Sequence, residues 1–250
     1  MISIVIPMYN EKERIGVTLS EIEEFIRENP GLVTEVVLVD DGSTDNCVER
    51  SMRWIERLPL TIERLAKNTG KWGAIRQGIK IAKNDAILLL DADGSASVYE
   101  LEKIQLLRSY LVAKTSVFGS RFMKGASVEG KSFFRRLISR GYRIYVKFWY
   151  WYGTRMYGVN DMQCPMKLIY RSKIMMNRLK VDRFSGDIEL AGNIVGHVIN
   201  HPVKFVHKAG GNIKTATIVE MAVETAQIAL RLRRERLQDE EERDTIKKDL

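Results

Sequence analysis

Ala86-Ile87-Leu88-Leu89-Leu90-Asp91-Ala92-Asp93-Gly94-Ser95 is the most informative segment of this 250-residue chain. Its opening apolar run is too short for a helix and contains neither Gly nor Pro, which is typical of a buried strand in a parallel sheet. Asp91 and Asp93 follow where this strand ends, and the two-residue period of a strand points both carboxylates to one side. Two converging carboxylates can hold a divalent cation against a phosphate. A strand end with two solvated aspartates in a turn is the alternative, which this segment alone leaves open.

The composition indicates one domain that works on an anionic partner. The chain is 45% hydrophobic, which suffices for one α/β core with an appendage. Its formal net charge of +8 fits nucleic acid, a phosphorylated small molecule or an acidic membrane surface. No zinc-type spacing, RNA-binding aromatic signature or P-loop occurs, so no nucleic acid partner is expected. The two cysteines, Cys47 and Cys164, provide no disulfide framework and indicate a reducing compartment.

No targeting or membrane-spanning segment is expected. Met1 to Pro7 lacks a basic region followed by a long apolar stretch, so it is interpreted as a first strand and not as a signal peptide. Nowhere do about 18 apolar residues run together, as a membrane-spanning helix requires. The sequence therefore predicts a soluble or peripheral protein.

Strands and helices are expected to alternate from the first residue onward. The expected strands cover 2–7, 35–39, 60–64, 86–90 and 116–121, with a late strand near 202–206. The expected helices cover 13–29, 45–57, 74–82 and 99–110. This order predicts an α/β, Rossmann-like fold with a mostly parallel sheet and helices on both faces. Ligands of such sheets lie beyond the carboxyl ends of the strands. The loops there carry Glu11, Asp41, Lys71, Asp91, Asp93 and Arg121.

Two later segments differ in composition. Residues 131–157 interleave Arg and Lys with Phe, Tyr and Trp, which is typical of a helix at a membrane interface. The alternative is an amphipathic helix packed on the sheet with its arginines in water. From about Thr217 onward no helix breaker occurs, and the end of the chain is almost wholly charged. A docking face could be formed by Val219, Met221, Ala222, Ile228, Leu230 and Leu232.

Six motifs occur in the order seen in family 2 glycosyltransferases of the GT-A fold, which the chain resembles. They are Pro7-Met8-Tyr9-Asn10-Glu11, Val39-Asp40-Asp41-Gly42-Ser43-Thr44-Asp45, Asn68-Thr69-Gly70-Lys71, Asp91-Ala92-Asp93-Gly94, Gly119-Ser120-Arg121 and Asp161-Met162-Gln163-Cys164. Within that family the chain is similar to the dolichyl-phosphate glucosyltransferases and the dolichyl-phosphate mannose synthases. Gly94-Ser95 resembles the glucosyltransferase branch more closely, so UDP-glucose is the expected donor. UDP-N-acetylglucosamine and GDP-mannose are alternatives.

The resemblance implies a donor site by position. Its nucleotide-sugar contacts fall on Pro7, Tyr9, Glu11, Val39, Asp41, Lys71, Asp91 and Lys214. Asp91 and Asp93 would hold the diphosphate through Mg²⁺ or Mn²⁺. Ser95 stands where some mannose synthases supply a third ligand, and water could replace it.

The resemblance also implies an acceptor site and a catalytic set. The acceptor-phosphate contacts fall on Arg121, Arg135 and Ser139. The sugar pocket would be lined by Asp161, Gln163 and Asp187. The catalytic set is Asp93, Arg121, Gln163 and Asp187.

The activity implied by the resemblance is an inverting transfer of a hexose from a nucleotide sugar to a polyprenyl (dolichyl-type) phosphate. The enzyme would be peripheral on the cytoplasmic face of a membrane. Its glycosyltransferase domain would cover 1–215 and include the membrane-interface and acceptor segment 131–157. A charged helix or tail would cover 216–250. The metal and basic residues would stabilise the leaving diphosphate, and a phosphate nucleophile needs no strong base. One alternative is a soluble glycan or protein acceptor, and Asp187 or Glu189 would then take the proton of its hydroxyl group. A second alternative is a GDP-mannose-dependent synthase. A third is a non-catalytic membrane or nucleic-acid binding module.

Overall fold

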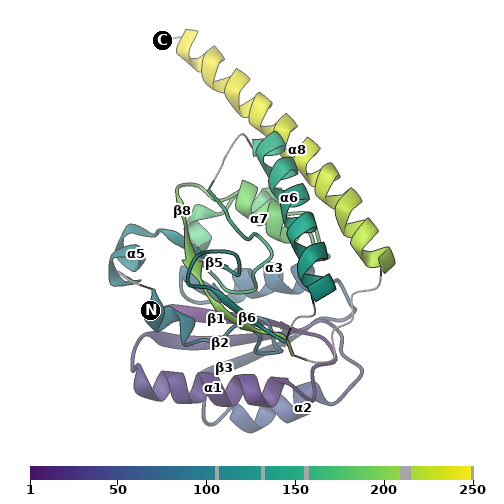
Figure 1. Cartoon of the computed structure of the whole chain (residues 1–250). Helices are drawn as coiled ribbons and strands as arrows, with labels where there is room; N and C mark the ends of the chain where they lie inside the picture. The colour runs from purple at the N-terminus through teal and green to yellow at the C-terminus, as the bar shows by residue number, and fades with distance from the viewer. Residues whose placement is uncertain (105–106, 131–132, 155–157, 209–214, 249–250) are drawn as a thin grey trace.

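A twisted sheet with helices on both faces forms the body of the protein (Figure 1). The computed structural model describes residues 1–104, 107–130, 133–154, 158–208 and 215–248. Within these residues the main sheet has seven strands in the order β3-β2-β1-β4-β7-β5-β8. They are β1 (Ile2–Met8), β2 (Val33–Asp40), β3 (Leu60–Arg64), β4 (Ala86–Leu89), β5 (Ser116–Ser120), β7 (Lys167–Tyr170) and β8 (Val198–Pro202).

Strand directions confirm a mostly parallel sheet with one reversed strand. β1 pairs in parallel with β2 and β4, β2 pairs in parallel with β3, and β5 pairs in parallel with β8. β7 is antiparallel to both of its neighbours, β4 and β5. All residues of β4 are buried, as the apolar run before Asp91 predicts. The acids that follow β4 therefore emerge at the carboxyl edge, in the middle of the sheet.

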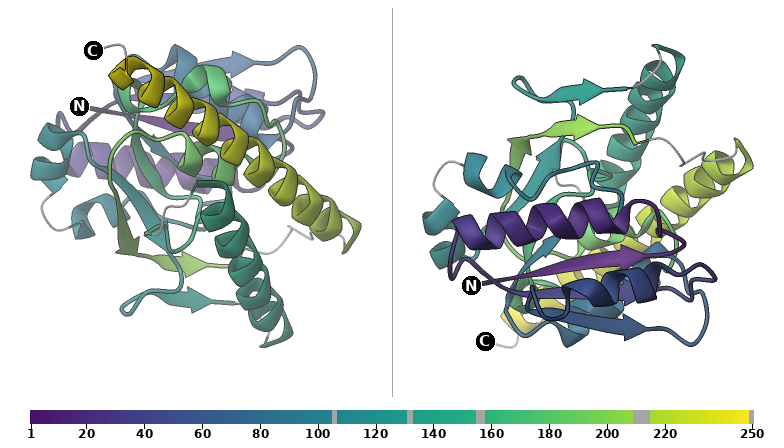
Figure 2. Two further views of the ribbon diagram at one scale, coloured as in Figure 1. Left: turned by 90° about the horizontal axis from the view of Figure 1, so that it is seen from above. Right: turned by 90° about the horizontal axis from the view of Figure 1, so that it is seen from below.

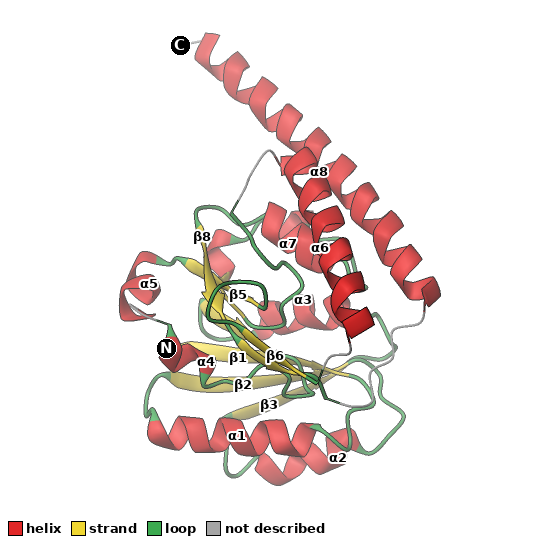
Figure 3. Ribbon diagram, viewed as in Figure 1, coloured by secondary structure: helices red, strands yellow, loops and turns green. Residues whose placement is uncertain are grey.

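Helices cover both faces of the sheet (Figure 3), and each face has its own hydrophobic core. On one face, α1 (Ile15–Glu28) buries an apolar stripe at helical spacing that includes Ile15, Leu19, Ile22 and Phe25. The short helices α2 (Cys47–Ser51), α4 (Glu100–Lys103) and α5 (Leu107–Ala113) accompany it. The opposite face is covered by α3 (Lys71–Ile81), α6 (Phe133–Thr154), α7 (Gly186–Gly192) and α8 (Thr215–Lys248).

Local structure differs from the expected elements in three places. The helix expected over 99–110 is divided, because Ile104 leaves the helical region with ψ 103° after α4. The helix expected over 45–57 ends at Ser51 and continues as a 3₁₀ turn, Met52–Trp54. The strand expected near 202–206 is divided at Val203 into β8 and β9 (Lys204–Val206), and β9 pairs with β6 (Ser127–Glu129) in a second sheet. Ile104, Trp54 and Val203 pack into or against the core at these breaks, and such packing can override local propensity.

The basic aromatic segment forms the helix α6, and part of its aromatic face is packed inside the protein. The hydroxyl of Tyr145 donates to the carbonyl of Ala222, and the hydroxyl of Tyr150 donates to the carbonyl of Ala191. Ile144 and Phe148, in contrast, are 66% and 54% exposed. The helix therefore has one face packed on the protein, as expected of an amphipathic helix, and one face in solvent, while its place at a membrane interface stays a prediction.

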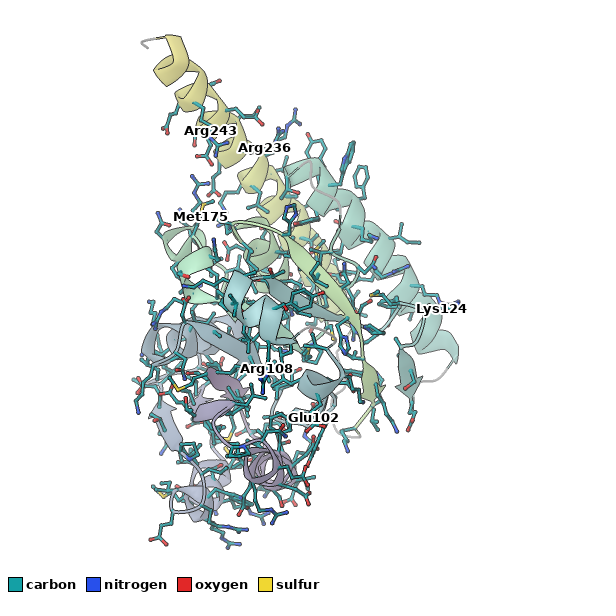
Figure 4. The ribbon with its side chains drawn as sticks, turned by 90° about the vertical axis from the view of Figure 1, so that its left-hand side faces the viewer. Glu102, Arg108, Lys124, Met175, Arg236 and Arg243 are labelled. Atoms are coloured by element: carbon teal, nitrogen blue, oxygen red, sulfur yellow. The ribbon has the colours of Figure 1, made fainter. Side chains whose placement is uncertain are left out.

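The last helix, α8, packs against α6 and α7 and then extends beyond the body (Figures 1 and 2). Met221, Ile228 and Leu232 are buried as predicted. The prediction was wrong for Val219 and Leu230, which are 61% and 42% exposed because they lie off that helical stripe. The side chains of Arg236 and Arg243 project from the outer half (Figure 4).

Two expectations about sequence composition can be compared with the structure. Both cysteines are free and buried, as the lack of a disulfide framework predicts. Among the described residues, none of the helices has the combination of length and apolar character that crossing a bilayer requires.

Candidate active site

A cavity of about 550 Å³ lies at the carboxyl edge of the sheet, between α6 and the first turns of α8. The two helices approach closely near Gly153, where an added Cβ would lie 2.7 Å from the carbonyl oxygen of Ala229. They diverge from there towards their first residues (Figures 1 and 2). The predicted site residues that line the cavity are Lys71, Asp91, Arg121, Ser139, Asp161, Gln163 and Asp187. Loops far apart in the sequence thus meet at one site, as the strand order predicts.

A tight turn carries the acidic pair. The carbonyl of Asp91 accepts the N–H of Gly94, and Oδ1 of Asp93 accepts the N–H of Ser95 at 2.9 Å. Gly94 has a φ of +64°, which favours glycine, and a Cβ there would lie 3.0 Å from Oγ1 of Thr18. Two carboxylates that share a turn at the end of a buried strand could hold one divalent cation. The described residues contain no group of three or more His, Cys, Asp or Glu side chains suited to a metal, so any further ligands would come from substrate or water.

Lys71 stands at the start of α3 and faces the acidic pair. The N–H groups of Trp72 and Gly73, next in the helix, donate to the carbonyl of Asp182 at 2.7 and 3.1 Å, which fixes this helix end against the loop before α7. Nζ of Lys71 lies 2.6 Å from Oδ1 of Asp91. Burial disfavours the ammonium form, but nearby carboxylates, foremost Asp91, outweigh burial and raise the pKa of Lys71. The cavity therefore holds a fixed positive charge beside Asp91.

Arg121 and Asp161 form a bidentate ion pair in the wall of the cavity. Nε and Nη2 of Arg121 donate to the two carboxylate oxygens at 2.7 and 2.9 Å, and the N–H of Arg121 donates to Oδ2 at 3.1 Å. Burial would raise the pKa of Asp161, but the charge and hydrogen bonds of Arg121 outweigh it and lower that pKa. Both side chains are largely buried, with exposed fractions of 18% for Arg121 and 3% for Asp161. Much of the positive charge assigned to the acceptor at Arg121 is thus neutralised inside the protein.

Asp187 pairs with a lysine that sequence reasoning missed. Nζ of Lys167, a residue only 1% exposed, donates to Oδ1 of Asp187 at 2.6 Å and to the carbonyl of Cys164. A lone lysine inside the apolar run that forms β7 was the available signal, because a buried ammonium needs an anionic partner. Asp187 therefore lines the cavity while the buried side chain of Lys167 holds its carboxylate in place.

Glu189 follows Asp187 by two residues but has a different environment. Its Oε2 accepts the N–H groups of Lys180 and Val181, and its Oε1 pairs with Arg231 of α8. It is 1% exposed and does not line the cavity. The expectation that Glu189 could take an acceptor proton is wrong, because its oxygens are used to hold a loop and α8 together.

Among the described residues predicted to contact the nucleotide, Lys71 and Asp91 line the cavity and the others do not. Glu11 is paired with Arg14, and burial, with the nearby Asp93 and Asp91, raises its pKa, so it lies close to the acidic turn. Asp41 accepts hydrogen bonds from Thr69 and Gly70, which fixes the loop before Lys71.

The remaining predicted donor contacts differ in exposure. Tyr9 is 46% exposed, Pro7 lies within β1, and Val39 is fully buried in the core between the sheet and α3. Lys214 and the side chain of Arg135 lie outside the described residues. The roles of these residues towards a nucleotide or acceptor remain predictions.

Gly186 offers a test of how closely the site loops pack. An added Cβ there would overlap the indole ring of Trp72, which is 1% exposed. Gly186→Ala is therefore expected to lower the free energy of unfolding by about 1–3 kcal/mol. Urea unfolding would measure this, with Gly141→Ala as control, because a Cβ at Gly141 in α6 meets no atom within 4 Å. Equal stability of the two variants would contradict the prediction.

Comparison with known proteins shows the family of the chain. The model of glycosyl transferase family 2 matches residues 3–166, which is more than half of the chain. The chain belongs to glycosyl transferase family 2. This family match extends from β1 to the residue before β7, and thus includes the acidic turn, Lys71, Arg121 and Asp161.

Relatives within this glycosyltransferase family include dolichyl-phosphate beta-glucosyltransferases. The human protein is 31% identical over 203 residues, which cover 76% of this chain and 61% of the human protein. The chain therefore spans about three fifths of that relative. A Trichomonas vaginalis protein of the same description is 28% identical over 243 residues, covering 92% of this chain and 71% of its own length.

A solved structure supports the fold. The glucosyl-3-phosphoglycerate synthase of Mycobacterium tuberculosis, in complex with Mn²⁺, UDP-glucose and phosphoglyceric acid, matches with a TM-score of 0.64. The match covers 93% of this chain and 79% of the synthase at 15% sequence identity. At this identity the likeness concerns the GT-A fold.

Proposed function

We propose that this glycosyltransferase moves glucose from UDP-glucose to dolichyl phosphate, with inversion at the anomeric carbon. The observation that carries the proposal is the composition of the cavity. Asp91 of the acidic turn and Lys71 line it, α6 contributes basic and apolar side chains, and α8 contributes apolar ones. Such a cavity suits a sugar diphosphate meeting a lipid phosphate. The descriptions of the relatives support glucose as the sugar and dolichyl phosphate as the acceptor.

The acidic turn fits a divalent cation bound together with the donor diphosphate. Asp91 and Asp93 offer hard carboxylate oxygens, and Mg²⁺ or Mn²⁺ commonly takes one or two carboxylates plus phosphate oxygens and water. When bound, the cation would supply Lewis-acid stabilisation of the charge on the leaving diphosphate. Lys71, paired with Asp91 at 2.6 Å, stands on the same side. The solved glucosyl-3-phosphoglycerate synthase, which has the same fold, is described with Mn²⁺ and UDP-glucose.

The environment of Asp187 favours a phosphate acceptor over a sugar hydroxyl. A hydroxyl nucleophile needs a base to take its proton, whereas a phosphate monoester is already ionised at neutral pH. One oxygen of Asp187 accepts a hydrogen bond from the buried ammonium of Lys167. A carboxylate held in this way is suited to accept hydrogen bonds from sugar hydroxyls and so to orient the glucosyl group.

The exposed face of α6 supports attachment to a membrane surface, where a dolichyl phosphate resides. Ile144 and Phe148 present apolar surface to solvent, and Lys147 is exposed on the same helix. Apolar side chains next to basic ones suit an interface with acidic lipids. The proposed location is the cytoplasmic face of a membrane, with the protein held peripherally.

Product analysis tests the proposed function. The purified protein is incubated with Mn²⁺, dolichyl phosphate and radiolabelled UDP-glucose, and the label is followed into organic solvent. We expect organic-soluble label that depends on dolichyl phosphate and is released by mild acid as glucose. Label from GDP-mannose instead of UDP-glucose would overturn the donor, and label on a water-soluble glycan would overturn the acceptor.

A further inference from the structure

The positive charges in and behind the cavity wall are unequally available to an incoming anion. Lys71, Arg121 and the buried Lys167 each lie within 3 Å of a carboxylate, at 2.6, 2.7 and 2.6 Å. A cation paired at such a distance exerts little net field on a third charge, because the two opposite charges largely cancel. An anionic acceptor entering this cavity therefore needs cations that are not already neutralised.

Arg143 is such a cation. It lines the cavity from α6, and among the described residues it makes no hydrogen bond and no ion pair. Its Nε is buried and lacks a hydrogen-bond partner there. Its guanidinium lies over the ring of Phe122, with Cζ 4.4 Å from the ring centroid. A guanidinium stacked on a ring keeps its N–H edges open for oxygen ligands in its own plane.

Lys147 lies one helical turn beyond Arg143 and also lines the cavity. Its Nζ is 3.4 Å from the amide oxygen of Asn160, a neutral partner. Residues four apart in a helix project from the same side, so the two cations face the cavity together. Together they form a basic pair without a paired acid among the described residues.

We propose that Arg143, assisted by Lys147, binds the phosphate group of the acceptor. This inference rests on the proposed function, in which the acceptor is a prenyl-type phosphate. Apolar side chains from both helices, Ile138, Val146, Ile218 and Met221, line the same cavity and fit the alkyl chain that follows the phosphate. Arg121, in contrast, holds the wall of the site through Asp161. In this assignment the acidic turn holds the diphosphate of the donor and Arg143 holds the phosphate of the acceptor, so the two groups have separate ligands.

Direct binding tests this assignment without relying on turnover. Farnesyl phosphate, a short prenyl phosphate, is titrated into the wild type, Arg143→Gln and Arg140→Gln by calorimetry. Arg140→Gln removes the same charge from the same helix at an exposed position that does not line the cavity. We expect Arg143→Gln to weaken binding about 10-fold or more, since hydrogen bonds to charged groups contribute this much. Arg140→Gln should change it less than about 2-fold.

Two further ligands and one further variant show whether the binding depends on the phosphate group and on the charge of Arg143. Farnesol, which lacks the phosphate, should bind the wild type and Arg143→Gln alike, and inorganic phosphate should bind both more weakly than farnesyl phosphate does. Arg143→Lys, which keeps the charge, should recover part of the lost affinity. Steady-state kinetics should show a raised KM for the lipid phosphate and an unchanged KM for UDP-glucose in Arg143→Gln.

The outcomes separate this inference from the proposed function. Unchanged affinity for farnesyl phosphate in Arg143→Gln, or no binding to the wild type, would overturn the role of Arg143. Binding that depends on Arg143 in a protein that makes no lipid-linked glucose would overturn the proposed transfer and leave the phosphate site standing. Thermal unfolding of each variant checks that the fold is retained.

Discussion

Asp93→Asn is expected to lower kcat/KM for the proposed glucosyl transfer about 10³-fold while the fold is retained. Asp93 and Asp91 are the only carboxylates of the acidic turn, and Asp91 is also engaged by Lys71. Loss of Asp93 would leave the cation with one protein carboxylate, and removing one preorganised charge-stabilising group costs about 10²- to 10³-fold or more. The amide oxygen of Asn can still accept the N–H of Ser95, so the turn should persist.

A control at the opposite end of the same strand isolates this effect. Asp85 precedes β4, accepts the N–H of Ser172 and pairs with Lys114 near the surface. Asp85→Asn removes the same charge from the other edge of the sheet, and its kcat/KM should stay within about 2-fold of wild type. Mn²⁺ affinity in the presence of UDP should fall for Asp93→Asn only. Wild-type turnover in Asp93→Asn, or turnover that survives chelation, would contradict a metal-assisted diphosphate site.

Local sequence patterns were sufficient to predict the mostly parallel sheet and the edge at which the site lies. The apolar run of β4 and the alternation of strands and helices were sufficient to place Lys71, Asp91 and Arg121 at one edge, because the carboxyl ends of parallel strands share an edge. The family motifs gave the same order. The reversed direction of β7 was not predicted, since strand direction depends on the path of the preceding chain and leaves no mark on a buried strand of four residues.

Partners distant in sequence could not be predicted. The role of Lys167 depends on its meeting Asp187 across the fold, and the neutralisation of Arg121 depends on Asp161, which lies 40 residues away. Likewise, Tyr145 and Tyr150 looked interfacial by composition, but α8 and α7 supply carbonyl acceptors that keep them inside. Amphipathic composition alone does not distinguish a membrane from a neighbouring helix.

Arg121→Met is expected to lower the free energy of unfolding by about 3–5 kcal/mol, because it leaves the buried carboxylate of Asp161 without a counter-charge. A loss of activity in this variant therefore does not by itself report on the acceptor. The double variant Arg121→Met/Asp161→Asn removes the uncompensated charge and keeps an oxygen that can accept the N–H of residue 121. It should recover most of the lost stability. Urea unfolding of the wild type, both single variants and the double variant gives the coupling energy directly.

The pH dependence of the same cycle distinguishes an ion pair from simple packing. Arg121 lowers the pKa of Asp161 in the folded protein, so the pair contributes stability that is fully present above the unfolded pKa of about 4 and is lost as pH falls through the folded value. Burial without Arg121 raises the pKa of Asp161 in the variant, so the stability difference between wild type and Arg121→Met should be largest near pH 7 and shrink steadily as the pH is lowered towards and below about 4. A difference that stays constant with pH would mean that the methylene groups of Arg121, and not its charge, support the wall of the cavity. In that case the guanidinium of Arg121 would be available to the acceptor phosphate. Arg121, and not Arg143, would then be assigned to bind that phosphate.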